Sequence, residues 1–160
     1  MLFSDKQEAN LRSCIQMIEE TISALGHDPD KSRLETQDLM PAWRVKKGSA
    51  HVYVALYSKD GANHLRVTAP VMHLEGEVDR PRLFQRLLEL NASDVRGAAF
   101  ALTGTEIVLT ADRPTLDLDR SEVHDLLRRV EDYADSFDDR LVAEFGGRMA
   151  GLSTVPVALR

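Results

Sequence analysis

The stretch HVYVALYSKDGANHLRVTA, residues 51–69, decides the fold. Its apolar and polar side chains alternate on both sides of Asp60-Gly61, a pair that favours a two-residue type I′ turn. Such a turn also sets the register of the two strands that it joins. The pairs predicted on one face are Leu56/Leu65, Val54/Val67 and Val52/Ala69, and those on the other are Tyr57/His64, Ala55/Arg66 and Tyr53/Thr68. Because the first face is wholly apolar, turn chemistry and polarity indicate the same antiparallel hairpin.

A further strand precedes this hairpin. Trp43, Val45 and Lys47 alternate with polar residues in a short strand that Gly48 ends, so the three strands make a meander. Pro70 lacks an amide hydrogen and predicts an edge or a bulge at that point.

A second hairpin follows further along the chain. Gly104-Thr105 fits the centre of a type II′ turn. That turn pairs Phe100 with Leu109 and Leu102 with Ile107 on an apolar face, and leaves Ala101/Val108 and Thr103/Glu106 on the reverse face.

Three amphipathic helices are predicted from apolar residues at helical spacing. Their boundary signals are a Ser4/Gln7 capping box and Gly26 for the first, an N-cap at Asp79 and a left-handed Asn91 for the second, and an Asp119/Glu122 capping box and Gly146-Gly147 for the third. The second helix carries Leu83, Phe84, Leu87 and Leu88 on one face, with Leu90 at its margin. Residues 27–40 are interpreted as a loop with a short helical turn around residues 34–39.

These elements define an α+β fold in the order α-β-β-β-α-β-β-α. One apolar face on each strand and three amphipathic helices predict two layers, with an antiparallel five-stranded sheet packed by the three helices. We expect a single domain over residues 1–147 and a C-terminal tail over residues 148–160.

Composition bounds the location and the partners of the protein. The formal net charge is −6 and Lys and Arg do not cluster, which disfavours direct binding to nucleic acid. No segment is long and uncharged enough to cross a bilayer, and the N-terminus lacks the pattern of an export signal. The single cysteine, Cys14, cannot form an internal disulfide and falls on the apolar face of the first helix. We therefore expect a cytoplasmic protein.

The sequence contains no assembled catalytic or metal-binding motif, and we expect no cofactor. Ser121, His124 and Asp125 fall within one turn of helix, whereas a catalytic triad usually draws its members from separate elements. His64 and His73 are nine residues apart, so on an uninterrupted strand they face opposite sides and cannot share a metal ion.

The order of the elements and three segments resemble a known family. The segments are RLFQRLLELNAS (82–93), AAFALTGTEIVLTADRP (98–114) and LDRSEVHDLLRRVEDYAD (118–135). Together they resemble the YbjN-like domain family, described as bacterial sensory transduction regulators, and more distantly the small dimeric chaperones of type III secretion. The resemblance covers roughly residues 43–145. It implies a cytoplasmic homodimer without a cofactor, whose second helix and neighbouring hairpin strand form the subunit contact and whose sheets or grooves hold another protein.

Two groups of residues are candidates for contact with a partner. An apolar patch on the outward face of the second hairpin and the residues left over at the second helix give a candidate dimer or partner interface of Arg82, Arg86, Leu90, Ala99, Ala101 and Val108. An acidic run on the polar side of the third helix, suited to a basic segment of a partner, consists of Glu131, Asp132, Asp135, Asp138 and Asp139.

The leading hypothesis is a non-catalytic, homodimeric adaptor or chaperone-like regulator that binds another protein. It would do so by strand addition to a sheet edge or by seating an amphipathic segment in a groove. Two alternatives stay open. One is an enzyme whose site is assembled from dispersed residues such as His51, His64 and Asp60. The other is an accessory protein in nucleic-acid metabolism, acting through a nucleic-acid-binding partner or through a local basic patch of Arg44, Lys46 and Lys47.

Overall fold

The computed structural model describes residues 2–36 and 40–151, and the backbone alone for residues 2–4. Its elements are α1 (Leu2–Ala24), α2 (Pro29–Ser32), β1 (Arg33–Leu34), β2 (Ala42–Lys47), β3 (Ala50–Lys59), β4 (Ala62–His73), α3 (Arg80–Ser93), β5 (Ala99–Thr103), β6 (Glu106–Pro114), α4 (Arg120–Phe145) and β7 (Arg148–Met149).

The predicted α+β class and antiparallel sheet are confirmed. The strands pair in the order β1-β2-β3-β4-β6-β5, and β7 pairs with β4. Over the described residues the sheet has seven strands where five were expected, because β1 and β7 contain only two residues each and are too short to show a period of two. The four-residue helix α2 was missed for the same reason. Residues 148 and 149, expected in a tail, are thus paired with the sheet.

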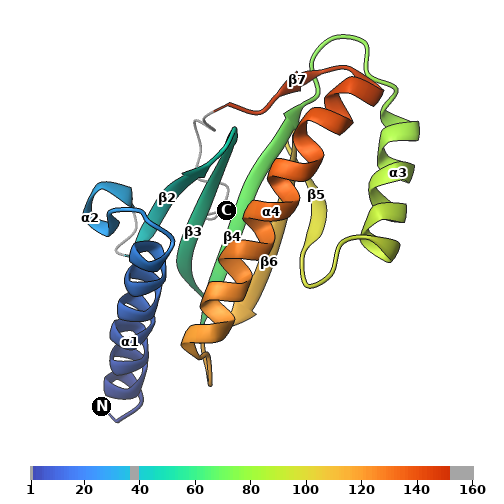
Figure 1. Cartoon of the computed structure of the whole chain (residues 1–160). Helices are drawn as coiled ribbons and strands as arrows, with labels where there is room; N and C mark the ends of the chain where they lie inside the picture. Colours follow the sequence, from blue (N-terminus) through green and yellow to red (C-terminus); the bar gives the residue numbers. More distant parts are fainter. Residues whose placement is uncertain (1, 37–39, 152–160) are drawn as a thin grey trace.

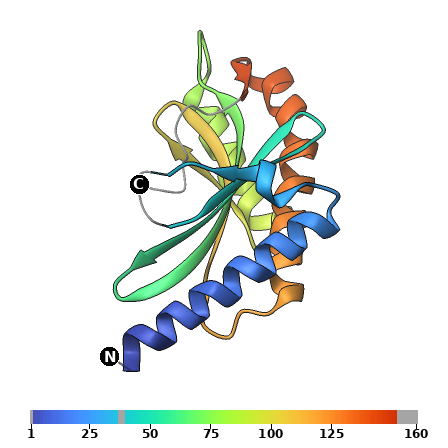
Figure 2. The same cartoon turned by 90° about the vertical axis from the view of Figure 1, so that its left-hand side faces the viewer.

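Helices α1 and α4 share one face of the sheet, and α3 lies on the far side of β5 (Figures 1 and 2). The core fills the space between α1, α4 and the strands, with Trp43, Leu56, Leu65 and Leu127 all completely buried. Asn10 ties α1 to the corner where β6 ends, since its side chain accepts a hydrogen bond from Thr115 Oγ1 at 2.7 Å.

The first hairpin has the predicted turn and register. Asp60 and Gly61 both have positive φ angles, of 52° and 78°, as a type I′ turn requires. The cross-strand pairs extend from Lys59↔Ala62 to Tyr53↔Thr68 and include five of the six predicted pairs. The pairing of Val52 with Ala69 lies beyond this ladder and stays a prediction.

The second hairpin is also confirmed, with Gly104 at a φ of 59° and all four predicted pairs in place. The register between β4 and β6 shifts between Pro70 and Met72, so the predicted bulge is present. The alternative of an edge at Pro70 is excluded, because β4 lies between β3 and β6.

Helix boundaries were predicted less well. Helix α1 begins at Leu2, so Ser4 is not its N-cap, and Gln7 donates from Nε2 to the carbonyl oxygen of Gly61 at 2.8 Å instead. Asp28 is the N-cap of α2, and Leu34 lies in β1 where a helical turn was expected. Residues 37–39 of that predicted turn lie outside the described residues.

For α3 and α4 the predicted beginnings are confirmed, and the predicted end of α3 is not. Asp79 is the N-cap of α3, and Asp119 with Glu122 forms the predicted capping box of α4. The predicted end of α3 is wrong, because the helix continues through Asn91 to Ser93. Asn91 is not among the described residues with positive φ, and its side chain has a partner that the sequence does not reveal.

Candidate protein-binding surface

Helix α3 turns one leucine towards solvent and three towards the core. Leu83, Leu87 and Leu90 are 0%, 5% and 2% exposed, whereas Leu88 is 69% exposed. A period of 3.6 residues brings positions 83, 87 and 90 within one face and rotates position 88 well away from it. Leu90 was placed at the margin and Leu88 on the buried face, and both placements are wrong.

Strand β5 carries the second exposed leucine of this region. Leu102 is 51% exposed, and Ala99 and Ala101 are half-buried. Val108, which was expected on an outward patch, is only 1% exposed. It lies on β6, which has β4 on one side and β5 on the other, so neighbouring strands flank it. Leu102 lies on the edge strand and is open on that account.

The two arginines of the predicted interface differ in their contacts. Arg82 is exposed, lies 3.6 Å from the carboxylate of Glu144 and places its guanidinium over the ring of Phe145. It therefore joins α3 to the end of α4 while staying accessible. Arg86 is half-buried on α3.

We define the α3–β5 surface as the accessible residues of these two elements, namely Arg82, Arg86, Leu88, Ala99, Ala101 and Leu102. It wraps around the edge of the sheet, because Ala99 and Ala101 lie on one face of β5 and Leu102 lies on the other. It keeps four of the six residues predicted from sequence. Leu90 and Val108 drop out because they offer no accessible area, and Leu88 and Leu102 replace them. The signal that could have found Leu88 was the helical phase of α3, once Leu83, Leu87 and Leu90 were taken as the buried set.

The side chain of Asn91 bridges α3 and β5. Its Oδ1 accepts a hydrogen bond from the amide of Phe100 at 2.7 Å, and its Nδ2 donates to the carbonyl oxygen of Phe100 at 3.2 Å. One side-chain amide thus satisfies both backbone groups of one residue on the edge strand.

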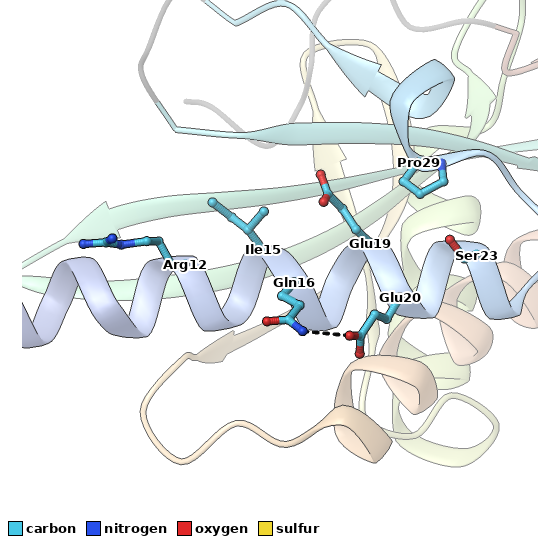
Figure 3. A pocket seen from close by; sticks show the side chains of 7 residues that line it. All are labelled: Arg12, Ile15, Gln16, Glu19, Glu20, Ser23 and Pro29. Atoms are coloured by element: carbon cyan, nitrogen blue, oxygen red, sulfur yellow. Dashed lines mark hydrogen bonds between the residues drawn. The ribbon is translucent and has the colours of Figure 1, made fainter.

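A shallow depression follows α1 (Figure 3). It is lined by Arg12, Ile15, Gln16, Glu19, Glu20, Ser23 and Pro29. Most of its charged groups already have partners. Gln16 Nε2 donates to Glu20 Oε1 at 2.9 Å, Glu19 pairs with Arg33 at 2.9 Å, and Glu20 also pairs with Arg120. With its polar groups engaged in this way, the depression lacks the convergent free donors and acceptors of a small-molecule site.

The acidic run of α4 is only partly a solvated face. Asp132, Asp135 and Asp139 are exposed, but Glu131 and Asp138 are 2% and 5% exposed, which corrects the prediction for these two. Asp138 accepts a hydrogen bond from Ser49 Oγ at 2.6 Å, and Asp132 pairs with Lys47. These two contacts hold the turn between β2 and β3 against α4. Asp132 and Asp138, which were expected to bind a partner, thus bind residues of this chain.

The side chains that were weighed for catalysis do not converge. Ser121 Oγ donates to Asp119 Oδ1 at 2.6 Å and has no bond to His124. His51 pairs with Lys46 and His64 pairs with Tyr57, which is six residues further along β3 than His51, so about 20 Å separates the two histidines. Within residues 2–36 and 40–151 no three His, Cys, Asp or Glu side chains are grouped to hold a metal ion.

The remaining titratable candidates are also separated. His64 Nδ1 lies 3.3 Å from Asp112 and His73 Nε2 lies 2.9 Å from Glu106, on different parts of the sheet. Burial raises the pKa of the Cys14 thiol, so it is a poor nucleophile. Burial also lowers the pKa of His51, and the nearby cations Lys46 and Arg44 add to the effect. Lys47, the third member of the basic patch, is paired with Asp132.

None of the described helices combines the length and the hydropathy needed to cross a bilayer.

The fold is that of type III secretion chaperones. The crystal structure of the ExsC-ExsE complex matches with a TM-score of 0.60 at 16% identity, covering 81% of this chain and 94% of that chain. A heterodimeric ExoU-SpcU complex from the type III secretion system of Pseudomonas aeruginosa matches with a TM-score of 0.54 at 14% identity, covering 79% and 96%. No curated protein matches the sequence.

The sequence itself places the chain in a family. The model of "T3SS (YopN, CesT) and YbjN peptide-binding chaperone 1" matches residues 12–151. The chain therefore belongs to this family of peptide-binding chaperones, as the resemblance to YbjN-like domains implied.

Proposed function

We propose that this protein is a non-catalytic, cytoplasmic, homodimeric chaperone-like adaptor that holds a segment of another protein. The observation that carries the proposal is the match of residues 12–151 to a family of peptide-binding chaperones. The two similar structures named above are complexes of two different proteins, which agrees with a protein partner.

The absence of catalysis in this proposal rests on chemistry. Among the described residues, Ser121 and His73 are bound to different carboxylates, and the groups that do meet, Tyr57, His64 and Asp112, are engaged with one another and with Arg66. General acid–base catalysis needs a side chain that is free to exchange a proton and lies within hydrogen-bond reach of the reacting group of a bound substrate. The function of the chain is therefore better explained by surface shape than by reactive groups.

The α3–β5 surface is the proposed subunit contact. Leu88 and Leu102 are two of the three large apolar side chains that the described part of the chain exposes. Covering such a side chain contributes about 1.5 to 3 kcal/mol, and the arginines beside it suit the rim of an interface. A C2 contact would bring the same surface of two copies together.

Leu88→Asp tests the subunit contact. We expect it to weaken self-association roughly tenfold to a hundredfold, since a charge replaces the apolar side chain that the partner covers. Leu116→Asp is the matched control, because Leu116 is 76% exposed in the loop between β6 and α4, away from this surface. Sedimentation at several concentrations makes the comparison. Equal association by both variants would remove α3–β5 from the contact.

Recovery of the partner tests the binding function. The tagged chain is purified under mild conditions from the cells of origin, the bound segment is delimited by limited proteolysis, and the complex is rebuilt from purified parts. We expect a stoichiometric complex that protects one continuous segment of the partner. If no partner protein is recovered, or none rebinds after purification, the proposed function fails.

A further inference from the structure

The β5 edge of the sheet is a place where another strand could pair. Among the strands that the structure describes, β5 has β6 as its single neighbour (Figure 1). Strand β5 contains five residues. An edge strand presents unpaired amide and carbonyl groups that recruit further strands, including those of other molecules. The way in which this edge is protected determines how a second copy of the chain, or another protein, can bind there.

The alternation of hydrogen bonds along β5 identifies the backbone groups that point away from β6 and could pair with an added strand. The two-residue turn makes Thr103↔Glu106 a hydrogen-bonded pair, so Thr103, Ala101 and Ala99 point their backbone groups towards β6. The backbone groups of Phe100 and Leu102 therefore point outwards. These are the two positions along β5 that an added strand would use.

Asn91 occupies one of these two positions. Its carboxamide accepts from the amide of Phe100 and donates to its carbonyl oxygen, at 2.7 Å and 3.2 Å, which are the two bonds that a paired strand would make there. Helix α3 holds the side chain in place, because the residue before it, Leu90, is fully packed in the core. Of these two positions, only Leu102 has outward backbone groups without a partner among the described residues, and one residue cannot hold a strand.

We propose that Asn91 is an edge cap that closes β5 to strand addition, so that a second copy or a partner meets this side of the molecule through side chains of α3 and not through a continued sheet. The side-chain amide imitates a peptide group of an absent neighbouring strand. The inference concerns the edge itself and holds for any partner, whether or not the proposed dimer forms.

Asn91→Ala tests the cap. Removing the carboxamide opens Phe100, so two outward positions become available in succession. We expect the variant to form larger species with an association constant roughly tenfold higher than that of the parent, the size that one or two net hydrogen bonds supply. Sedimentation velocity at several concentrations measures the effect, with circular dichroism to establish that the variant is folded.

Two further variants separate edge pairing from simple loss of stability. Leu102→Pro in the Asn91→Ala background removes the remaining outward amide and leaves the ladder to β6 intact, so it should return association to the parent level. Ser49→Ala removes the bond to Asp138 far from β5 and should not increase association.

The outcomes are distinguishable from those of the proposed dimer. The proposed dimer fails if Leu88→Asp has no effect on the parent chain. The edge cap is overturned if folded Asn91→Ala associates no more than the parent, or if Ser49→Ala associates as strongly as Asn91→Ala does. Continued association of the double variant with Leu102→Pro would likewise overturn it, since strand pairing could not then be the cause.

Discussion

At the scale of single residues, Glu131 is a buried acid on α4. It is 2% exposed, and its Oε1 has no hydrogen-bond partner among the described residues. Burial raises the pKa of this carboxyl group, and Asp132 adds to the rise, while Lys47, His27 and His124 oppose it. A carboxyl group with a raised pKa binds its proton more tightly in the folded than in the unfolded protein.

The contribution of Glu131 to the free energy of unfolding should therefore fall as the pH rises. The favourable effect of its proton is complete below the unfolded pKa of about 4.3 and is lost as the pH rises through the raised folded value. We expect Glu131→Gln to be more stable than the parent by on the order of 1 kcal/mol at neutral pH, with the difference vanishing below about pH 4. Urea unfolding at several pH values measures it. A variant that is less stable than the parent at pH 7 would show that the Glu131 carboxylate makes a stabilising interaction in the folded protein.

Asp112 organises a polar cluster across three strands. It accepts hydrogen bonds from Tyr57 Oη at 2.6 Å and from Arg66 Nε at 2.7 Å, and the ring of His64 stacks on Tyr57. Burial, followed by the hydrogen bond and the charge of Asp112, raises the pKa of Tyr57 to about 12.

Asp112→Asn keeps the shape of the side chain and removes its charge. We expect the pKa of Tyr57 to fall from about 12 part of the way to the ordinary value of 10.0, because burial, the largest cause, persists. An NMR titration of the tyrosine rings measures this pKa, and Tyr57→Phe assigns the signal. An unchanged pKa would mean that burial alone sets it.

At the scale of elements, the phase of α3 separates core from surface. We expect Leu90→Ala to lose about 2 to 5 kcal/mol of unfolding free energy, because it empties a filled site in the core. Leu88→Ala should change stability by less than about 0.5 kcal/mol, since its side chain is 69% exposed. Chemical denaturation of both variants makes the comparison. Similar losses for the two leucines would contradict the orientation of α3.

The strands were predictable because their signals are local. Asp60-Gly61 and Gly104-Thr105 specify turns whose two central residues fix the register, and the alternation of side chains then follows. The end of α3 was not predictable in this way. Asn91 has the chemistry of a helix end, and its actual role depends on β5, which only the tertiary structure brings beside it.

The contrast between local signals and tertiary contacts also explains which residues of the candidate site were predicted correctly. Arg82, Arg86, Ala99 and Ala101 could be placed on an accessible face from periodicity alone. Val108 was misplaced because the hairpin pattern shows which face of β6 it lies on but not whether that face is covered, and the structure leaves it only 1% exposed. Glu131 and Asp138 were missed because burying an acid is expensive, so sequence reasoning places acids in solvent by default.

At the scale of the whole molecule, one sheet carries two helices on a face and a third helix beyond its β5 edge (Figure 1). The side chains that could do chemistry hold this assembly together instead. Tyr57, Arg66 and Asp112 join three strands, and Ser49 and Asp138 join a turn to α4. Two of the three large apolar side chains that the described residues expose, Leu88 and Leu102, lie on α3 and β5, which suits a protein that binds other polypeptides.

Intact-mass spectrometry of the complex rebuilt with the recovered partner segment tests the central claim most directly. If the protein is a peptide-binding chaperone, the complex will contain both components in a fixed ratio, and the segment will leave it with its mass unchanged after long incubation. A segment that emerges cleaved or chemically altered, or a chain that stays free of it at concentrations where both are folded and soluble, would contradict the account.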